Sequence, residues 1–144
     1  MIACDVNILL NAQNAALPDH ERFATWFEDA LNGATPVGIP SMVFSGYLRI
    51  VTNHRIWPRP LQPEQALEII AAIRTAPAFA PIEPGPRHWE IFAELCRKAQ
   101  VKANLVPDAY LAAIAIEHGC EWITADRGFA RYPGVRWRHP LDDG

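Results

Sequence analysis

The chain has 144 residues, half of them apolar, and a formal net charge of −3 with its histidines neutral. This length predicts a single domain, residues 1–144, with one hydrophobic core. The composition excludes a disordered tail, and thirteen prolines favour many short elements over a coiled coil. The acidic balance removes bulk charge as an argument for nucleic-acid binding, so any basic surface has to be local.

The three cysteines, Cys4, Cys96 and Cys120, are widely spaced and include no CxxC pair. They fit neither a disulfide framework nor a zinc cluster, and they are typical of a reducing cytosol. No basic leader precedes Asp5, and no apolar run approaches the roughly 20 residues that span a bilayer. We therefore expect a soluble cytoplasmic protein.

Short apolar runs alternate with amphipathic segments along the chain. The expected strands are residues 2–4, 37–39, 79–82, 121–124 and 135–137, and the expected helices are 19–32, 41–51, 64–74, 87–100 and 107–118, with a further turn into helix after Asp5. This alternation predicts βαβ units, and hence an α/β fold whose parallel sheet is covered by helices on both faces.

Two acids follow expected strands directly. Asp5 follows residues 2–4, and Asp126 follows residues 122–125. In open α/β sheets, ligands bind beyond the carboxyl ends of the strands, which makes both acids candidate site residues. The alternative for each is an Asx turn that leads the chain out of its strand.

A third acid, Asp108, shares a helical stripe with Leu111, Ala112 and Ala115. That stripe is expected to face the core or the sheet edge, so its carboxylate points inward. The alternative is an acid in the first turn of a helix, where it complements the helix dipole by about 0.3–1 kcal/mol.

If the sheet brings the three acids together, their mutual repulsion is large. At ~4 Å and an effective dielectric of 20, each carboxylate pair costs about 4 kcal/mol, so either their pKa values rise or a cation neutralises them. Mg²⁺ takes oxygen ligands, uses few carboxylates and keeps several waters. Such an ion can activate water and stabilise charge on a phosphoryl group, which predicts a metal-dependent phosphodiesterase.

Three motifs carry a resemblance to a known family: Asp5-Val6-Asn7, residues 104–113 (NLVPDAYLAA) and residues 124–129 (TADRGF). Residues 44–53 and 132–138 extend it over nearly the whole chain. In order and spacing these motifs resemble the PIN domain, and more narrowly the VapC toxins of bacterial type II toxin–antitoxin systems.

This resemblance implies a three-layer α/β/α fold and a Mg²⁺-dependent (or Mn²⁺-dependent) endoribonuclease. It also implies a homodimer, inhibited by a small cognate antitoxin of the VapB type. By position, Asp5, Asp108 and Asp126 match the family's acidic metal site and catalytic residues. Thr124 matches the hydroxyl residue that orders this site, and Asn7 matches a supporting polar residue.

Two positions depart from the family pattern. Gly46 stands where many PIN nucleases carry a glutamate, and Gly128 stands at a commonly acidic position. We interpret these glycines as a thinner metal shell. The alternative is a catalytically degenerate PIN fold that binds RNA or a protein without cutting. A phosphatase of the haloacid dehalogenase type is disfavoured because Asp5-Val6-Asn7 lacks that family's second aspartate.

Two basic stretches are candidates for RNA contact: Arg127, Arg131, Arg136 and Arg138, and then Arg49, Arg55 and Arg59 interleaved with Trp57. Arginine binds phosphate with two parallel hydrogen bonds, and an aromatic ring can stack on a base. We expect Arg49, Arg127 and Arg131 to contact RNA. The alternative is a solvated basic surface that balances acids elsewhere.

Overall fold

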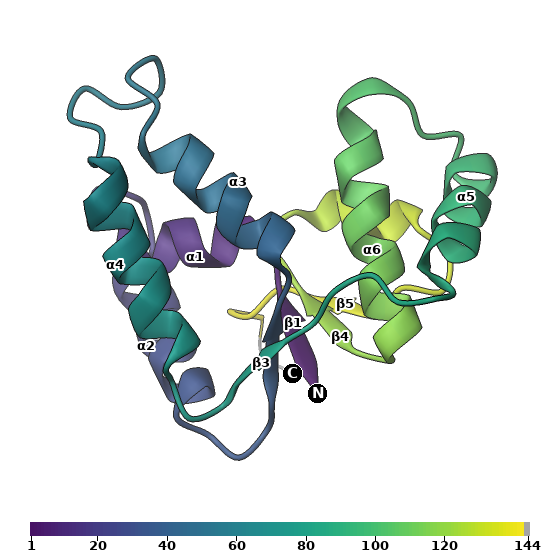
Figure 1. The fold of residues 1–144 in the computed structure, drawn as a ribbon, viewed down its shortest axis with the longest axis horizontal. Helices are drawn as coiled ribbons and strands as arrows, with labels where there is room; N and C mark the ends of the chain where they lie inside the picture. The colour runs from purple at the N-terminus through teal and green to yellow at the C-terminus, as the bar shows by residue number, and fades with distance from the viewer. Residues whose placement is uncertain (143–144) are drawn as a thin grey trace.

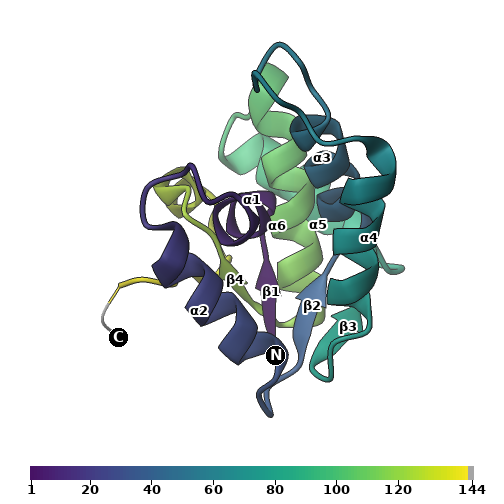
Figure 2. The same cartoon turned by 90° about the vertical axis from the view of Figure 1, so that its left-hand side faces the viewer.

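The computed structural model describes residues 1–142 and contains one five-stranded sheet. Its strands are β1 (Ile2–Cys4), β2 (Val37–Ile39), β3 (Phe79–Pro81), β4 (Glu121–Ile123) and β5 (Trp137–Arg138), in the order β3-β2-β1-β4-β5. Every neighbouring pair is parallel. Figure 2 shows four of these strands side by side, β4, β1, β2 and β3. The predicted parallel sheet is confirmed.

The helices form two groups on opposite sides of the sheet (Figure 1). They are α1 (Val6–Gln13), α2 (His20–Leu31), α3 (Ser41–Val51), α4 (Pro63–Arg74), α5 (His88–Lys98) and α6 (Val106–His118), with two 3₁₀ segments, η1 (Ala103–Leu105) and η2 (Arg127–Arg131). Helix α1 packs on α2 and α3, α3 packs on α4, and α5 packs on α6. The predicted three-layer α/β/α arrangement is therefore confirmed.

The three central strands β2, β1 and β4 are short and mostly buried, as expected for a sheet covered on both faces, whereas the edge strands β3 and β5 are partly exposed. Ala3, Cys4, Trp122 and Ile123 are all inaccessible to solvent in β1 and β4. Most element boundaries agree with the sequence prediction within two residues. The last strand was predicted at 135–137 but lies at Trp137–Arg138, because the preceding chain turns through Gly134 with a positive φ of 89°.

The strand order creates a switch point between β1 and β4. The chain leaves β1 toward β2 on one side, and β4 lies on the other side of β1. Right-handed connections therefore place the flanking helices on opposite faces and open a crevice at the carboxyl ends of these two strands. Because α6 runs antiparallel to β4, its first turn lies at the same edge of the sheet. No helix within residues 1–142 has both the length and the apolar character to cross a membrane.

Candidate functional site at the carboxyl edge of the sheet

Asp5 lies where β1 ends and α1 begins. Its backbone N–H donates to the Ile123 carbonyl at 3.0 Å, which ties the end of β1 to β4. Its carboxylate oxygen Oδ1 accepts from the Val6 N–H at 2.7 Å and so caps α1. The side chain is almost fully buried, with 4% exposed. One oxygen of Asp5 thus has a local structural role.

The other oxygen of Asp5 belongs to a hydrogen-bonded network. Thr124 Oγ1 donates to Asp5 Oδ2 at 2.8 Å, and Asn7 Nδ2 donates to the same oxygen at 3.2 Å. Thr124 Oγ1 also accepts from Asn7 Nδ2 and from the Asp126 N–H, both at 3.0 Å. Because two donors occupy the lone pairs of the Thr124 hydroxyl, its single proton has to point at Asp5. Asn7 Oδ1 accepts from the Ala125 N–H at 2.9 Å and closes the network.

Asp126 lies immediately beyond this network, on the turn that enters η2. Its Oδ1 accepts from the Gly128 N–H at 2.8 Å, which is the Asx-turn bond proposed as its alternative role. The side chain is exposed, and the described residues supply no hydrogen bond to its second oxygen. The turn therefore leaves most of this carboxylate available.

Asp108 lies in the first turn of α6 and is half-buried. Leu111, Ala112 and Ala115 of its stripe are buried, so this face of α6 turns inward as the sequence predicted. Both its own burial and the nearby Asp126 carboxylate raise the pKa of Asp108, whereas Arg131 lowers it. Asp108 and Asp126 therefore share one electrostatic environment.

Burial raises the pKa of Asp5 to about 6. Hydrogen bonds from Thr124 and Val6 oppose that rise, and the charges of Asp108 and Asp126 add to it. In the part of the chain that the structure describes, none of these three carboxylates has an ion-pair partner within 4.0 Å. The fold thus brings three acidic side chains into electrostatic contact without neutralising them.

No group of three His, Cys, Asp or Glu side chains within residues 1–142 is arranged closely enough to form a complete metal-binding cluster. A hard divalent cation nevertheless suits the oxygen donors, the buried negative charge and the lack of a paired base. Mg²⁺ in particular keeps several of its waters and needs only a few carboxylates. The residues present fit a largely hydrated ion better than a closed protein cage.

The arginines after Asp126 lie in different places. Arg131 stays beside the aspartates, and its Nε donates to the Gly128 carbonyl at 2.9 Å. Arg127 forms a two-pronged ion pair with Asp142 at 2.9 and 3.0 Å. Arg136 donates to the Gly119 carbonyl just before β4, and Arg138 pairs with Glu121 at the start of β4. These last two arginines point to the opposite edge of the sheet.

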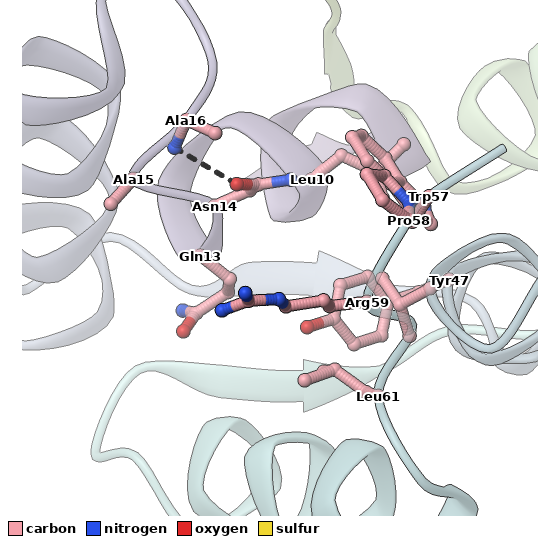
Figure 3. A pocket seen from close by; sticks show the side chains of 11 residues that line it. Leu10, Gln13, Asn14, Ala15, Ala16, Tyr47, Trp57, Pro58, Arg59 and Leu61 are labelled. Atoms are coloured by element: carbon pink, nitrogen blue, oxygen red, sulfur yellow. Dashed lines mark hydrogen bonds between the residues drawn. The ribbon is translucent and has the colours of Figure 1, made fainter. Parts of the chain in front are cut away.

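Two residues of the second basic stretch, Trp57 and Arg59, line a separate pocket (Figure 3). This pocket has a volume of about 340 Å³ and is lined by Trp57, Arg59 and Leu61 together with the last residues of α1. The Trp57 indole N–H donates to the Ile50 carbonyl at 3.0 Å, which fixes the ring at the pocket wall. The pocket lies toward the far end of α1 from Asp5, since its lining residues on this helix are Leu10 and Gln13. Arg49 is exposed in the last turn of α3.

One residue of this region was missed in the sequence. Tyr132 is buried, with 3% exposed, and its hydroxyl donates to the Leu105 carbonyl at 3.1 Å. Burial raises its pKa to about 12, with a further contribution from the Asp108 charge. The bond joins the segment after Asp126 to the start of α6. No pattern in the sequence predicts this hydrogen bond, because a tyrosine that follows an arginine looks like any other core residue.

Comparison of the sequence with known families gives a match to the PIN domain over residues 2–135. A VapC ribonuclease of Mycobacterium bovis, Mb2897, is 41% identical over 142 residues, covering 99% of this chain and 97% of that protein. Ribonuclease VapC25 of Mycobacterium tuberculosis is 38% identical over 140 residues, covering 97% and 99%.

Solved structures share the fold at lower identity. VapBC2 from Rickettsia felis, solved bound to a promoter DNA fragment, matches with a TM-score of 0.70 at 17% identity and covers 96% of this chain and 98% of that one. VapC20 of Mycobacterium tuberculosis, described as a toxin that cleaves the sarcin–ricin loop, matches with a TM-score of 0.63 at 17% identity, covering 94% and 99%.

Proposed function

Because the chain belongs to the PIN domain family, we propose that it is a metal-dependent endoribonuclease and the toxin of a type II toxin–antitoxin system. One observation carries the proposal most directly. The buried Asp5 carboxylate, with its pKa raised to about 6, is coupled to Asp108 and Asp126, and no base within residues 1–142 pairs with any of them. Such a site gains most from a bound cation.

In this proposal Asp5, Asp108 and Asp126 hold Mg²⁺, with Mn²⁺ as a substitute. When bound, the ion supplies an activated water and offsets charge on the phosphodiester. Thr124 and Asn7 hold Asp5 in one orientation through their hydrogen bonds. The Thr124 hydroxyl also fixes the turn that carries Asp126, since it accepts from the Asp126 N–H.

The RNA strand crosses this edge of the sheet, beside arginine side chains. Arg131 lies next to the aspartates, and exposed Arg49 is free to reach a phosphate. Arg127 contributes only after its ion pair with Asp142 opens. An exposed pair of this kind contributes about 0–1 kcal/mol, so opening it carries a small free-energy cost.

The partners follow from the same family membership. The Rickettsia felis neighbour is a VapBC complex, and a Klebsiella pneumoniae neighbour is a toxin–antitoxin complex. We extend this to a small VapB-like antitoxin and a homodimer for the present chain, working as a single domain. An RNA substrate and an antitoxin partner support action in the cytoplasm, which is part of this proposal.

A second candidate is a PIN fold that binds RNA or a partner without cutting it. Gly46 favours this alternative, since it provides no acid where many family members carry glutamate. A Cβ added there would meet only Val6 Cγ2, at 3.7 Å, so the backbone has room for a side chain that the sequence lacks. Metal-dependent turnover separates the two candidates.

The test compares purified wild type, Asp5→Asn and Asp29→Asn on the same RNA, in MgCl₂ and in EDTA. Asp29 is an exposed acid on α2 and provides a matched charge control. We expect wild type and Asp29→Asn to cleave only with Mg²⁺, and Asp5→Asn to lose cleavage. Sequencing of RNA ends after brief induction of each variant then identifies the target. Cleavage that survives EDTA or the Asp5 substitution would refute the nuclease proposal.

A further inference from the structure

Arg131 lies over a glycine beside the aspartates because of the local helix type. The segment η2 is a 3₁₀ helix, in which residues i and i+3 eclipse one another, and Gly128 and Arg131 have this spacing. Arg131 Nε donates to the Gly128 carbonyl at 2.9 Å. A Cβ added at Gly128 would lie 3.0 Å from Arg131 Nη2 and 2.9 Å from Asp126 Oδ1. The guanidinium of Arg131 can therefore occupy this position only because Gly128 has no side chain.

The guanidinium is held there by only one of its five N–H groups. Among the described residues, its Nε–H alone has a protein acceptor, and no carboxylate lies within ion-pairing distance of it. Arg127, four positions earlier, differs because Asp142 occupies both of its terminal nitrogens. Arg131 thus keeps its terminal N–H groups free for a ligand, and their planar fork suits a phosphate.

The charge of the site fits one divalent ion. Asp5, Asp108 and Asp126 carry three negative charges when ionised, and Arg131 adds one positive charge, which leaves −2. Arg131 acts on this site at close range, because the same point beside Gly128 lies 3.0 Å from Arg131 Nη2 and 2.9 Å from Asp126 Oδ1. A second divalent ion would have to bind next to a fixed guanidinium at a site already neutralised by the first.

We infer that Arg131 is a built-in cation of this site: held over Gly128, it limits the site to one divalent ion and donates its free N–H groups to the RNA phosphodiester. This inference rests on the proposed function for its RNA step. Its charge step concerns metal binding alone and stands separately. Arg131 then takes the place that a second metal ion would occupy in contacting the phosphate.

Metal titration without RNA tests the charge step. Mn²⁺ and Mg²⁺ are titrated by calorimetry into wild type, Arg131→Ala and Arg22→Ala, the last removing an exposed arginine of α2 that pairs only weakly with Asp19 at 3.8 Å. We expect one ion in wild type and in Arg22→Ala. Arg131→Ala should bind the first ion about five- to tenfold more tightly, as expected when a unit charge near a divalent ion is removed from a largely hydrated site. Two ions in wild type, or an unchanged or weaker affinity in Arg131→Ala, would overturn the inference.

Cleavage kinetics test the phosphate step. Here Arg131→Ala should impair the protein, whereas it should improve metal binding. Arg131→Ala should lower kcat/KM by roughly 10- to 100-fold, the range for one lost charge-assisted hydrogen bond, while Arg131→Lys keeps part of the rate. A merely structural arginine would weaken metal binding and cleavage together.

The two proposals fail in different ways. If the Arg131→Ala variant binds metal more tightly but neither it nor the wild type cleaves RNA, the charge step is supported and the nuclease proposal is refuted. Cleavage that is EDTA-sensitive but unaffected by Arg131→Ala supports the nuclease and refutes the phosphate contact.

Discussion

The raised pKa of Asp5 predicts that metal-free protein loses stability as the pH rises. In the unfolded chain this carboxyl has its ordinary pKa of 3.8, and in the fold burial raises it to about 6. Between these values the folded state binds more protons, so the contribution of Asp5 is fully present below pH 3.8 and is lost as the pH passes 6. A difference of about two pKa units corresponds to about 3 kcal/mol, of which about 2 kcal/mol falls between pH 4.5 and 7.5.

Urea unfolding in EDTA at several pH values measures this loss, with Asp5→Asn as the reference. The asparagine keeps a cap acceptor for α1 but does not titrate. The substitution therefore changes the free energy of unfolding by an amount to which residue 5 adds no pH dependence. Groups elsewhere, such as half-buried Glu117 and exposed Asp142 with their lowered pKa values, contribute equally to both proteins and cancel. The wild type should therefore lose about 2 kcal/mol more than Asp5→Asn across this range.

Mg²⁺ should reverse the loss, because it binds the ionised carboxylates of the folded state. At ten times its dissociation constant, an ion bound only by the folded protein adds about 1.4 kcal/mol. We expect that gain in wild type at pH 7.5, little gain at pH 4.5, and little in Asp5→Asn at either pH. Parallel pH profiles for the two proteins in EDTA would refute the electrostatic reasoning, and an equal Mg²⁺ gain in both would refute the placement of the ion.

Three other substitutions test the packing and the network. Thr124→Val should destabilise the protein by about 1–3 kcal/mol and raise the pKa of Asp5 further, with Thr124→Ser as the control; an unchanged urea midpoint would contradict the network. Gly38→Ala places a Cβ 2.9 Å from Ile82 Cδ1 and should cost about 1–3 kcal/mol in thermal unfolding, and Ile82→Val should rescue part of it, so strictly additive effects would count against the clash. Tyr132→Phe should cost about 1 kcal/mol and weaken Mg²⁺ binding, which titration calorimetry measures, and full metal affinity would show that its hydroxyl does not position α6.

Different sequence patterns predict the strand-end acids and the acid on α6. Asp5 and Asp126 were located because short apolar runs end directly before them, and strand ends in a parallel sheet share an edge. Asp108 was located by helical periodicity, since Leu111 and Ala112 mark the buried face of α6. The strand order itself was not predictable from such local patterns, because it depends on which strands pair across long segments.

The arginines show where sequence reasoning fails. Arg127 and Arg131 both follow Asp126 within five residues and look alike as local basic residues, yet Asp142 pairs with Arg127 and not with Arg131. That pairing joins residues fifteen apart through the turn after β5, and no periodicity signals it. The position of Arg131 over Gly128 had a signal, the three-residue spacing, but it is informative only once the segment is known to be a 3₁₀ helix rather than an α-helix.

Asp5 and Asp126 can each hold a turn or a helix cap and also contribute to a cation site, because a carboxylate has about four acceptor positions. Asp5 uses three of them, for Val6, Thr124 and Asn7, whereas Asp126 uses one, for Gly128. Asp5 is therefore left to act mainly through its buried charge, and Asp126 through oxygens that face solvent. It follows that replacing Asp126 by asparagine removes one ligand oxygen and its charge while leaving the pH profile of stability almost intact, whereas the same change at Asp5 abolishes that profile.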